Sequence, residues 1–167
     1  LSGVEAHAVG DDPLAGVDLQ RTCERAAYEA GGGGFVAPAQ LVGDFLQGTT
    51  SSAVGGVCPT YARGVSWDEA CAGLPPYVTQ SLRAAIPLMD RRLHGFAATD
   101  AVLTGVETRS SSPVRVTRGR DGQSVSTRGL WPCGEGAGYA GGIMSAATDG
   151  LNTAEALVRT RVAQGHR

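Results

Sequence analysis

Residues 129–143 read GLWPCGEGAGYAGGI, and this stretch decides which fold the sequence predicts. Its first five residues form a short apolar run typical of a strand, and a long helical pattern begins near Gly141. Gly136, Gly138 and Gly141 match the G-x-G-x-x-G spacing of dinucleotide-binding turns. That spacing normally opens a β-α-β unit with a second strand and an acidic residue about 20 positions on. No second strand follows here, so the simple Rossmann interpretation is incomplete.

Glu135 gives the same stretch a second chemical interpretation. A strand would deliver its carboxylate to the edge of a sheet, where it can accept hydrogen bonds from the hydroxyls of a sugar or sugar alcohol. The glycines would let the backbone lie against a ligand without Cβ clashes. The helix that follows would point free N–H groups and its positive end at negative charge, including charge on a reduced flavin ring. The structural alternative is a tight strand-to-helix turn that binds nothing.

Composition excludes several classes of protein. The chain has 167 residues, of which 42% are hydrophobic and 18% charged, a composition typical of a globular protein. Its net charge of −2 gives no sign of a nucleic-acid-binding surface. All 14 basic residues are Arg, which excludes a Walker A loop, a Schiff-base lysine and a Ser-Lys dyad. The four cysteines and three histidines have no metal-ligand spacing, so we expect reduced thiols and no metal.

The ends and the hydropathy of the chain suggest a location. The first residue is Leu1, no basic and apolar leader opens the chain, and no stretch of about 20 apolar residues occurs. We therefore expect a piece of a longer protein without a membrane span, and the expected reduced thiols suggest that it is cytoplasmic.

The pattern along the chain changes character near Phe96. Before it we expect helices from Asp12-Pro13 to Ala30, over Pro38–Gln47, after a capping box at residues 66–69, and from Pro75 or Pro76. After it we expect a strand at residues 101–108 and a hairpin of residues 114–118 and 123–127 around a Gly-Arg-Asp-Gly turn. A strand at residues 129–133 and a helix at residues 141–163 complete the chain. One face of that helix would be apolar, with Ile143, Ala147, Leu151, Ala154, Val158 and Val162.

Four segments together resemble the C-terminal part of bacterial FAD-dependent dehydrogenases. They are residues 12–17 (DPLAGV), 37–40 (APAQ), 105–114 (GVETRSSSPV) and 131–147 (WPCGEGAGYAGGIMSAA). The resemblance runs from about residue 12 to the end, and the GEGAGYAGG run is its most specific part. It implies an α/β fold, or α+β for the fragment alone, from a two-domain Rossmann-like FAD/NAD(P)-binding flavoprotein.

The resemblance also implies that the chain has two regions with different roles. Residues 1–95 would be a mostly helical part of an inserted substrate or cap region, and residues 96–167 the returning part of the FAD domain. FAD is the expected cofactor, and NAD(P)H is a candidate co-substrate. Glu135 would meet the ribityl hydroxyls, and the backbone of residues 141–143 would face the pyrimidine edge of the flavin. The full expected cofactor-binding set is Gly134, Glu135, Gly136, Gly138, Tyr139, Gly141, Gly142 and Ile143.

Several single residues have two interpretations. Arg109 is a weak catalytic candidate, because a guanidinium over the flavin could bind a carboxylate substrate, or it forms a surface salt bridge. Tyr139 either contacts the flavin or packs against a neighbouring loop. Cys133 is either a redox-active thiol beside the expected flavin site or, the favoured interpretation, a buried structural thiol. Arg115, Arg118 and Arg120 are expected to be solvated hairpin residues.

The expected function is therefore part of an FAD-dependent oxidoreductase. Its expected partners are the missing N-terminal half of the polypeptide and a small-molecule substrate, with a homo-oligomer as a further candidate. The alternatives are a non-catalytic nucleotide- or phosphate-binding domain and a structural interaction module. On the first interpretation the fragment alone would be inactive, and it would be poorly stable, dimerise, or fold mainly through its helical region.

Overall fold

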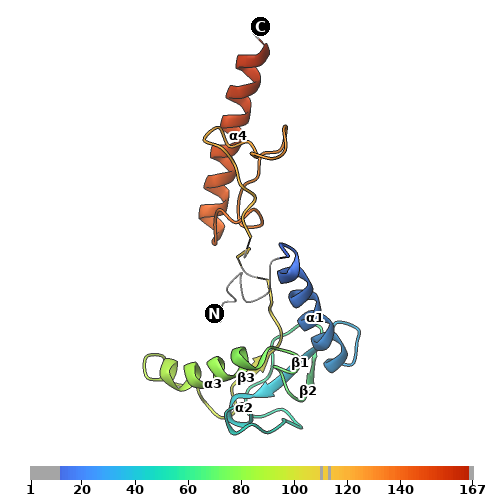
Figure 1. The fold of residues 1–167 in the computed structure, drawn as a ribbon. Helices are drawn as coiled ribbons and strands as arrows, with labels where there is room; N and C mark the ends of the chain where they lie inside the picture. Colours follow the sequence, from blue (N-terminus) through green and yellow to red (C-terminus); the bar gives the residue numbers. More distant parts are fainter. Residues whose placement is uncertain (1–11, 110, 113, 166–167) are drawn as a thin grey trace. The chain divides into compact units, whose positions relative to one another are not determined.

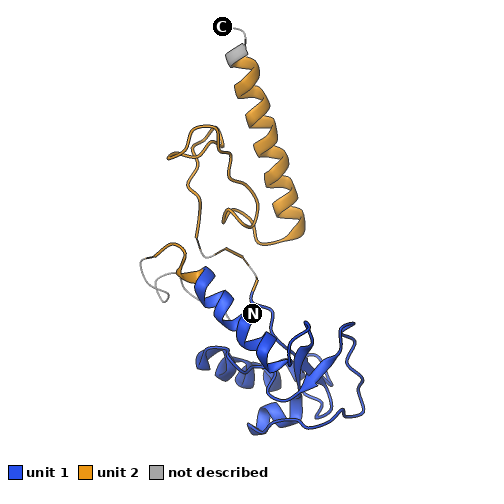
Figure 2. Ribbon diagram, turned by 90° about the vertical axis from the view of Figure 1, so that its right-hand side faces the viewer, with its two compact units in different colours: residues 1–3, 17–108 blue, residues 4–16, 109–167 orange. Residues whose placement is uncertain are grey.

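The computed structural model describes residues 12–109, 111–112 and 114–165 (Figure 1). Contacts divide the chain into two compact units. The first holds Val17–Thr108, and the second holds the residues from Arg109 onward together with residues 12–16 (Figure 2). Each unit is described by itself below. The expected division at residues 95 and 96 concerns the domains of a longer protein, and it stays a prediction.

A three-stranded sheet forms the centre of the first unit. Strand β1 (Ala37–Leu41) lies in the middle, parallel to β2 (Val65–Trp67) on one side and antiparallel to β3 (Val102–Thr104) on the other. Four of the five β1 residues are buried, so this strand is covered on both faces rather than on one. The unit therefore has a mixed α/β architecture.

Three helices accompany the sheet. Helix α1 (Ala15–Ala30) begins where predicted, because the Asp12 carboxylate accepts a hydrogen bond of 2.8 Å from the backbone N–H of Leu14. Helix α2 (Val42–Gln47) ends at Gly48, which adopts the left-handed conformation expected of a C-terminal cap. Helix α3 (Pro76–Asp90) begins directly after Pro75, as the sequence indicates. The core is formed by Val42, Phe45 and Ile86, with Leu46, Leu82 and Leu103 packed around them.

Two predictions for the first unit are wrong. The helix expected over Pro38–Gln47 is a strand as far as Leu41, because Ala37 precedes a proline and the segment pairs with two neighbouring strands. The capping box expected at residues 66–69 does not start a helix. Ser66 and Trp67 lie in β2 and pair with β1, and this long-range pairing overrides the local signal. The strand expected at residues 101–108 is confirmed only at Val102–Thr104.

The second unit consists of loops beside one long helix, α4 (Ile143–Gly165). The expected hairpin is reduced to a single antiparallel bridge between Arg118 and Ser124, closed by a turn in which Gly119 donates a backbone hydrogen bond to Gln123. The strand expected at residues 129–133 is absent, since these described residues are irregular. Pro132 lacks an N–H group, and the stretch has no neighbouring strand among the described residues. The described residues therefore do not confirm the expected Rossmann-like arrangement.

Candidate functional site

The glycine-rich stretch forms consecutive turns that lead into α4. Backbone hydrogen bonds run from Gly138 to the Glu135 carbonyl (3.0 Å) and from Tyr139 to the Gly134 carbonyl (3.1 Å). Gly138 has a φ of 79°, and a Cβ there would collide with the Val114 carbonyl and the Arg115 backbone. A Cβ at Gly136 would meet nothing within 4 Å. Gly138 is therefore required by the fold, whereas the Gly136 backbone faces open space.

Tyr139 is held between two arginines of the neighbouring loop. Its ring centroid lies 3.7 Å from the Arg118 guanidinium carbon and 5.0 Å from that of Arg115. Its hydroxyl accepts a hydrogen bond from the backbone N–H of Arg118 (3.0 Å) and donates one to the Val116 carbonyl (3.1 Å). Of the two interpretations of Tyr139, packing against a neighbouring loop is the one seen here. A contact between Tyr139 and a cofactor stays a prediction.

Arg118 and Asp149 form the polar centre of the second unit, and sequence reasoning missed them. The two guanidinium nitrogens of Arg118 contact the two carboxylate oxygens of Asp149 at 3.0 and 2.5 Å. Arg118 also donates to the Pro132 carbonyl (2.8 Å), and Asp149 accepts from the Gly134 N–H (2.9 Å). Each side chain is less than one-fifth exposed, so the expectation of a solvated Arg118 is wrong.

The electrostatics of this pair follow from its hydrogen bonds. The bonds from Arg118 and then from the Gly134 N–H lower the pKa of Asp149, because they stabilise the carboxylate. The hydrogen bond to Asp149 raises the pKa of Arg118, because it stabilises the protonated guanidinium. The pair therefore stays ionised at neutral pH and joins the hairpin, the glycine-rich turn and α4.

The expected ligand-facing groups remain open. The first N–H groups of α4, on Ile143, Met144 and Ser145, donate to no acceptor in the described part of the chain, and the first backbone bond runs from Ala146 to Gly142. Gly141, Gly142 and Ile143 are exposed, and Glu135 is half-buried. No described residue donates a hydrogen bond to the Glu135 carboxylate. The turn thus brings Glu135 and a free helix terminus into one short segment.

The remaining candidate residues are placed as follows. Arg109 is exposed, and its role toward a substrate stays a prediction. Cys133 is also exposed, so the expectation of a buried thiol is wrong. Ser110 and Pro113, which belong to the segment quoted above, lie outside the described residues. Among residues 12–109, 111–112 and 114–165 no group of His, Cys, Asp or Glu could hold a metal ion, and no helix is long and apolar enough to cross a membrane.

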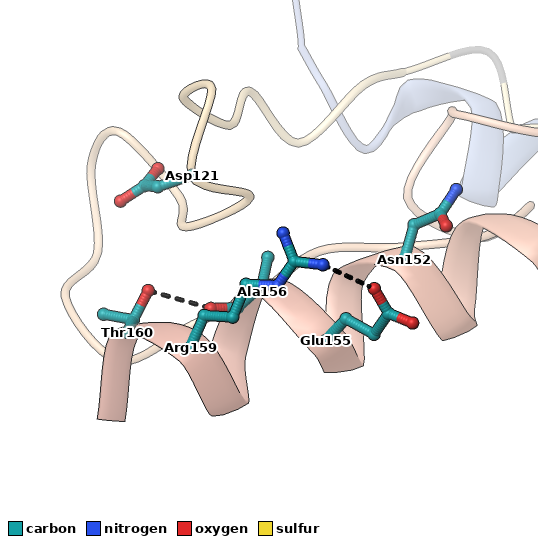
Figure 3. Close-up of a pocket in the computed structure, with 6 residues that line it drawn as sticks. All are labelled: Asp121, Asn152, Glu155, Ala156, Arg159 and Thr160. Carbon is teal, nitrogen blue, oxygen red and sulfur yellow. Dashed lines mark hydrogen bonds and ion pairs between the residues drawn. The ribbon is translucent and has the colours of Figure 1, made fainter. Parts of the chain in front are cut away.

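An open groove of about 480 Å³ lies between the hairpin turn and α4 (Figure 3). Its lining residues are Asp121, Asn152, Glu155, Ala156, Arg159 and Thr160. Glu155 and Arg159 form an exposed ion pair at 3.1 Å within it. The lining includes none of the expected cofactor-binding residues, and no sequence pattern singled this groove out.

Comparison with known proteins finds a relative that is much longer than this chain. The chain is 46% identical over 149 residues to an uncharacterized protein of Clostridium beijerinckii. That match covers 89% of this chain but 28% of the relative, so this chain spans less than a third of the relative's length. The match is longer than residues 1–110 and so extends into the second unit.

The family of the chain follows from a second match. Residues 2–110 match the family described as FAD-dependent protein, C-terminal domain-like, and the chain belongs to that family. The matched stretch contains the whole sheet of the first unit. The glycine-rich turn lies outside it, so the resemblance of that turn to a flavin-binding signature is a separate argument.

Proposed function

We propose that the chain is part of an FAD-dependent oxidoreductase of the dehydrogenase type and forms the flavin side of its FAD site. The observation that carries this proposal is the open terminus of α4 in the same glycine-rich segment as Glu135, in a chain of an FAD-dependent family. Free N–H groups at a helix start favour negative charge, and a flavin gains negative charge when it is reduced. The open space at Gly136 fits a ligand that lies close to the backbone.

Each part of the turn has a specific role in this proposal. Glu135 accepts hydrogen bonds from the ribityl hydroxyls, and the N–H groups of residues 141–143 face the pyrimidine edge of the ring system. Tyr139 and the Arg118–Asp149 pair hold the turn in shape, which fixes where those groups point. FAD supplies the hydride acceptor, while the protein supplies position and electrostatics.

The rest of the chain and the longer polypeptide complete the proposal. Residues 1–95 serve as the cap or substrate region, and residues 96–167 return to the FAD domain. The N-terminal part of the polypeptide holds the pyrophosphate and adenosine of FAD. Arg109 binds an anionic small-molecule substrate, NAD(P)H is the co-substrate, and the protein acts in the cytoplasm.

The test is the flavin content of the complete gene product. We expect purified protein to show a flavin absorbance spectrum and to release FAD on denaturation. Glu135→Gln removes a charged acceptor, so it should weaken FAD binding about tenfold, the loss typical of one charge-assisted hydrogen bond. Glu155→Gln, which changes an exposed carboxylate in the groove, is the matched control and should leave FAD binding unchanged. A protein that neither contains nor takes up FAD would contradict the proposal.

A further inference from the structure

The long helix α4 packs its polar side against its own unit and leaves its apolar side exposed. The side that packs against its own loops is polar or small, with Asp149, Thr153 and Ala156, and Thr153 is buried there. The opposite side carries the apolar stripe of Ile143, Ala147, Leu151, Ala154, Val158 and Val162. An ordinary surface helix does the reverse, because burying apolar area is what stabilises its packing.

The large members of the apolar stripe are strongly exposed. Ile143 is 89% exposed, Leu151 69%, Val158 60% and Val162 56%. In Figure 2 the loops of the second unit run along one side of α4. A continuous apolar surface of this kind on a chain without a membrane-spanning helix among its described residues marks an interface rather than scattered surface residues.

The described residues of the second unit form almost no hydrophobic core of their own. Of the buried hydrophobic residues in the described chain, Ala137 is the single one in this unit, whereas the first unit has eight. Ile143, the most exposed of the large hydrophobic residues in the described chain at 89%, lies in the apolar stripe instead. A partner that covers the stripe would complete a core that the chain cannot form alone.

We infer that the apolar stripe of α4 packs against the face of a β-sheet formed by the remainder of the same polypeptide. The inference deepens the proposed function and rests on it, because that remainder is the flavin-binding part proposed above. The length of chain needed is available in the relative, of which this chain covers 28%. Helices that pack on sheets through one apolar stripe are the usual layers of α/β domains.

The spacing of the stripe favours this partner over a second copy of the helix. Ile143 and Ala154, Ala147 and Val158, and Leu151 and Val162 are each eleven residues apart, which is close to three turns of an α-helix. Such a stripe runs nearly straight along the helix. A two-stranded left-handed coiled coil needs an apolar repeat of 3.5 residues per turn; Ala147, Leu151, Ala154 and Val158 fit such a repeat, but its next position is the charged Arg161.

The test compares thiol labelling at two positions of α4. Val158→Cys lies in the stripe, and Asn152→Cys lies on the groove side of the same helix (Figure 3). Both variants are made in the complete gene product and in the 167-residue chain, treated with N-ethylmaleimide, and followed by peptide mass spectrometry, which separates these sites from Cys58 and Cys133. Flavin content is measured on the same samples.

We expect the thiol of Val158→Cys to react at least about tenfold more slowly in the complete protein than in the 167-residue chain, with that of Asn152→Cys unchanged. Cross-links from position 158 should then reach residues upstream of this chain. Equal labelling of Val158→Cys in both proteins, protection already present in the 167-residue chain, or cross-links to a second copy would each overturn the inference. Protection without bound flavin would support the interface and contradict the proposed function, so the two failures are distinguishable.

Discussion

The carboxylate of Asp149 connects three segments, because it accepts hydrogen bonds from Arg118 on the hairpin and from Gly134 in the glycine-rich turn. Asp149→Asn keeps the size but removes the charge, so we expect the free energy of unfolding to fall by about 1–3 kcal/mol. Glu155→Gln is the matched control, since its ion pair with Arg159 is exposed and should contribute less than about 0.5 kcal/mol. Chemical denaturation of both variants checks this. Equal effects would show that burial of the Asp149 pair is unimportant.

The same residue predicts a dependence on pH. The pKa of Asp149 is lowered in the folded protein, so its contribution is fully present above the pKa of an unfolded aspartate. It is lost as pH falls through the lowered pKa. We expect the stability difference between the natural protein and Asp149→Asn to shrink in acid and to stay constant from weakly acidic to neutral pH. A difference that persists in strong acid would contradict this assignment.

Gly138 and Gly136 have opposite requirements within one motif. Gly138→Ala places a side chain in a left-handed conformation and against the Val114 carbonyl, so it should cost about 1–2 kcal/mol for the conformation alone and more for the collision. Gly136→Ala should change the stability by less than about 0.5 kcal/mol, because its Cβ meets open space. Thermal unfolding of the two variants checks this. If both are equally destabilised, the turn is packed differently from the structure described here.

At the scale of elements, the sequence predicted those that carry a local signal. Helices α1 and α3 begin within three residues of the signals at Asp12-Pro13 and Pro75-Pro76, and α4 follows from its apolar periodicity. Strands β1 and β2 were missed, since they exist through pairing between residues about 28 positions apart. The Arg118–Asp149 pair joins residues 31 positions apart and likewise leaves no trace in local spacing. For the candidate site, the glycines and Glu135 could be found by pattern, but not the contacts that hold them.

Strand β1 depends on one buried amide. Gln40 is 2% exposed, donates to the Thr49 carbonyl (2.7 Å) and accepts from the Ala70 N–H (3.3 Å). Gln40→Leu leaves both backbone groups without this partner, so we expect a loss of about 1–3 kcal/mol. Gln80→Leu, at an exposed position of α3, is the control and should be nearly neutral. Urea unfolding of the two variants gives the comparison, and a tolerated Gln40→Leu would mean that this amide does not stabilise the strand.

At the scale of the whole molecule, the two units differ in how much apolar surface they bury. The first unit has the core of Val42, Phe45 and Ile86 behind a paired sheet, whereas the second is held by the largely buried Arg118–Asp149 ion pair and by Tyr139. Burial of large apolar side chains is the dominant stabilising contribution in a domain, so the units cannot be equally stable alone. A lower stability of the second unit alone is what we expect if further polypeptide completes its core.

Hydrogen exchange on the isolated 167-residue chain tests this difference. We expect the backbone amides of β1 and α3 to be protected, and those of the glycine-rich turn and α4 to exchange at least about tenfold faster, because opening the second unit exposes little buried apolar surface. In the complete gene product the amides of α4 should become as well protected as those of α3. Equal protection of both units in the isolated chain, or a monodisperse monomer that unfolds at high temperature in one cooperative step, would show that the second unit is complete without further polypeptide.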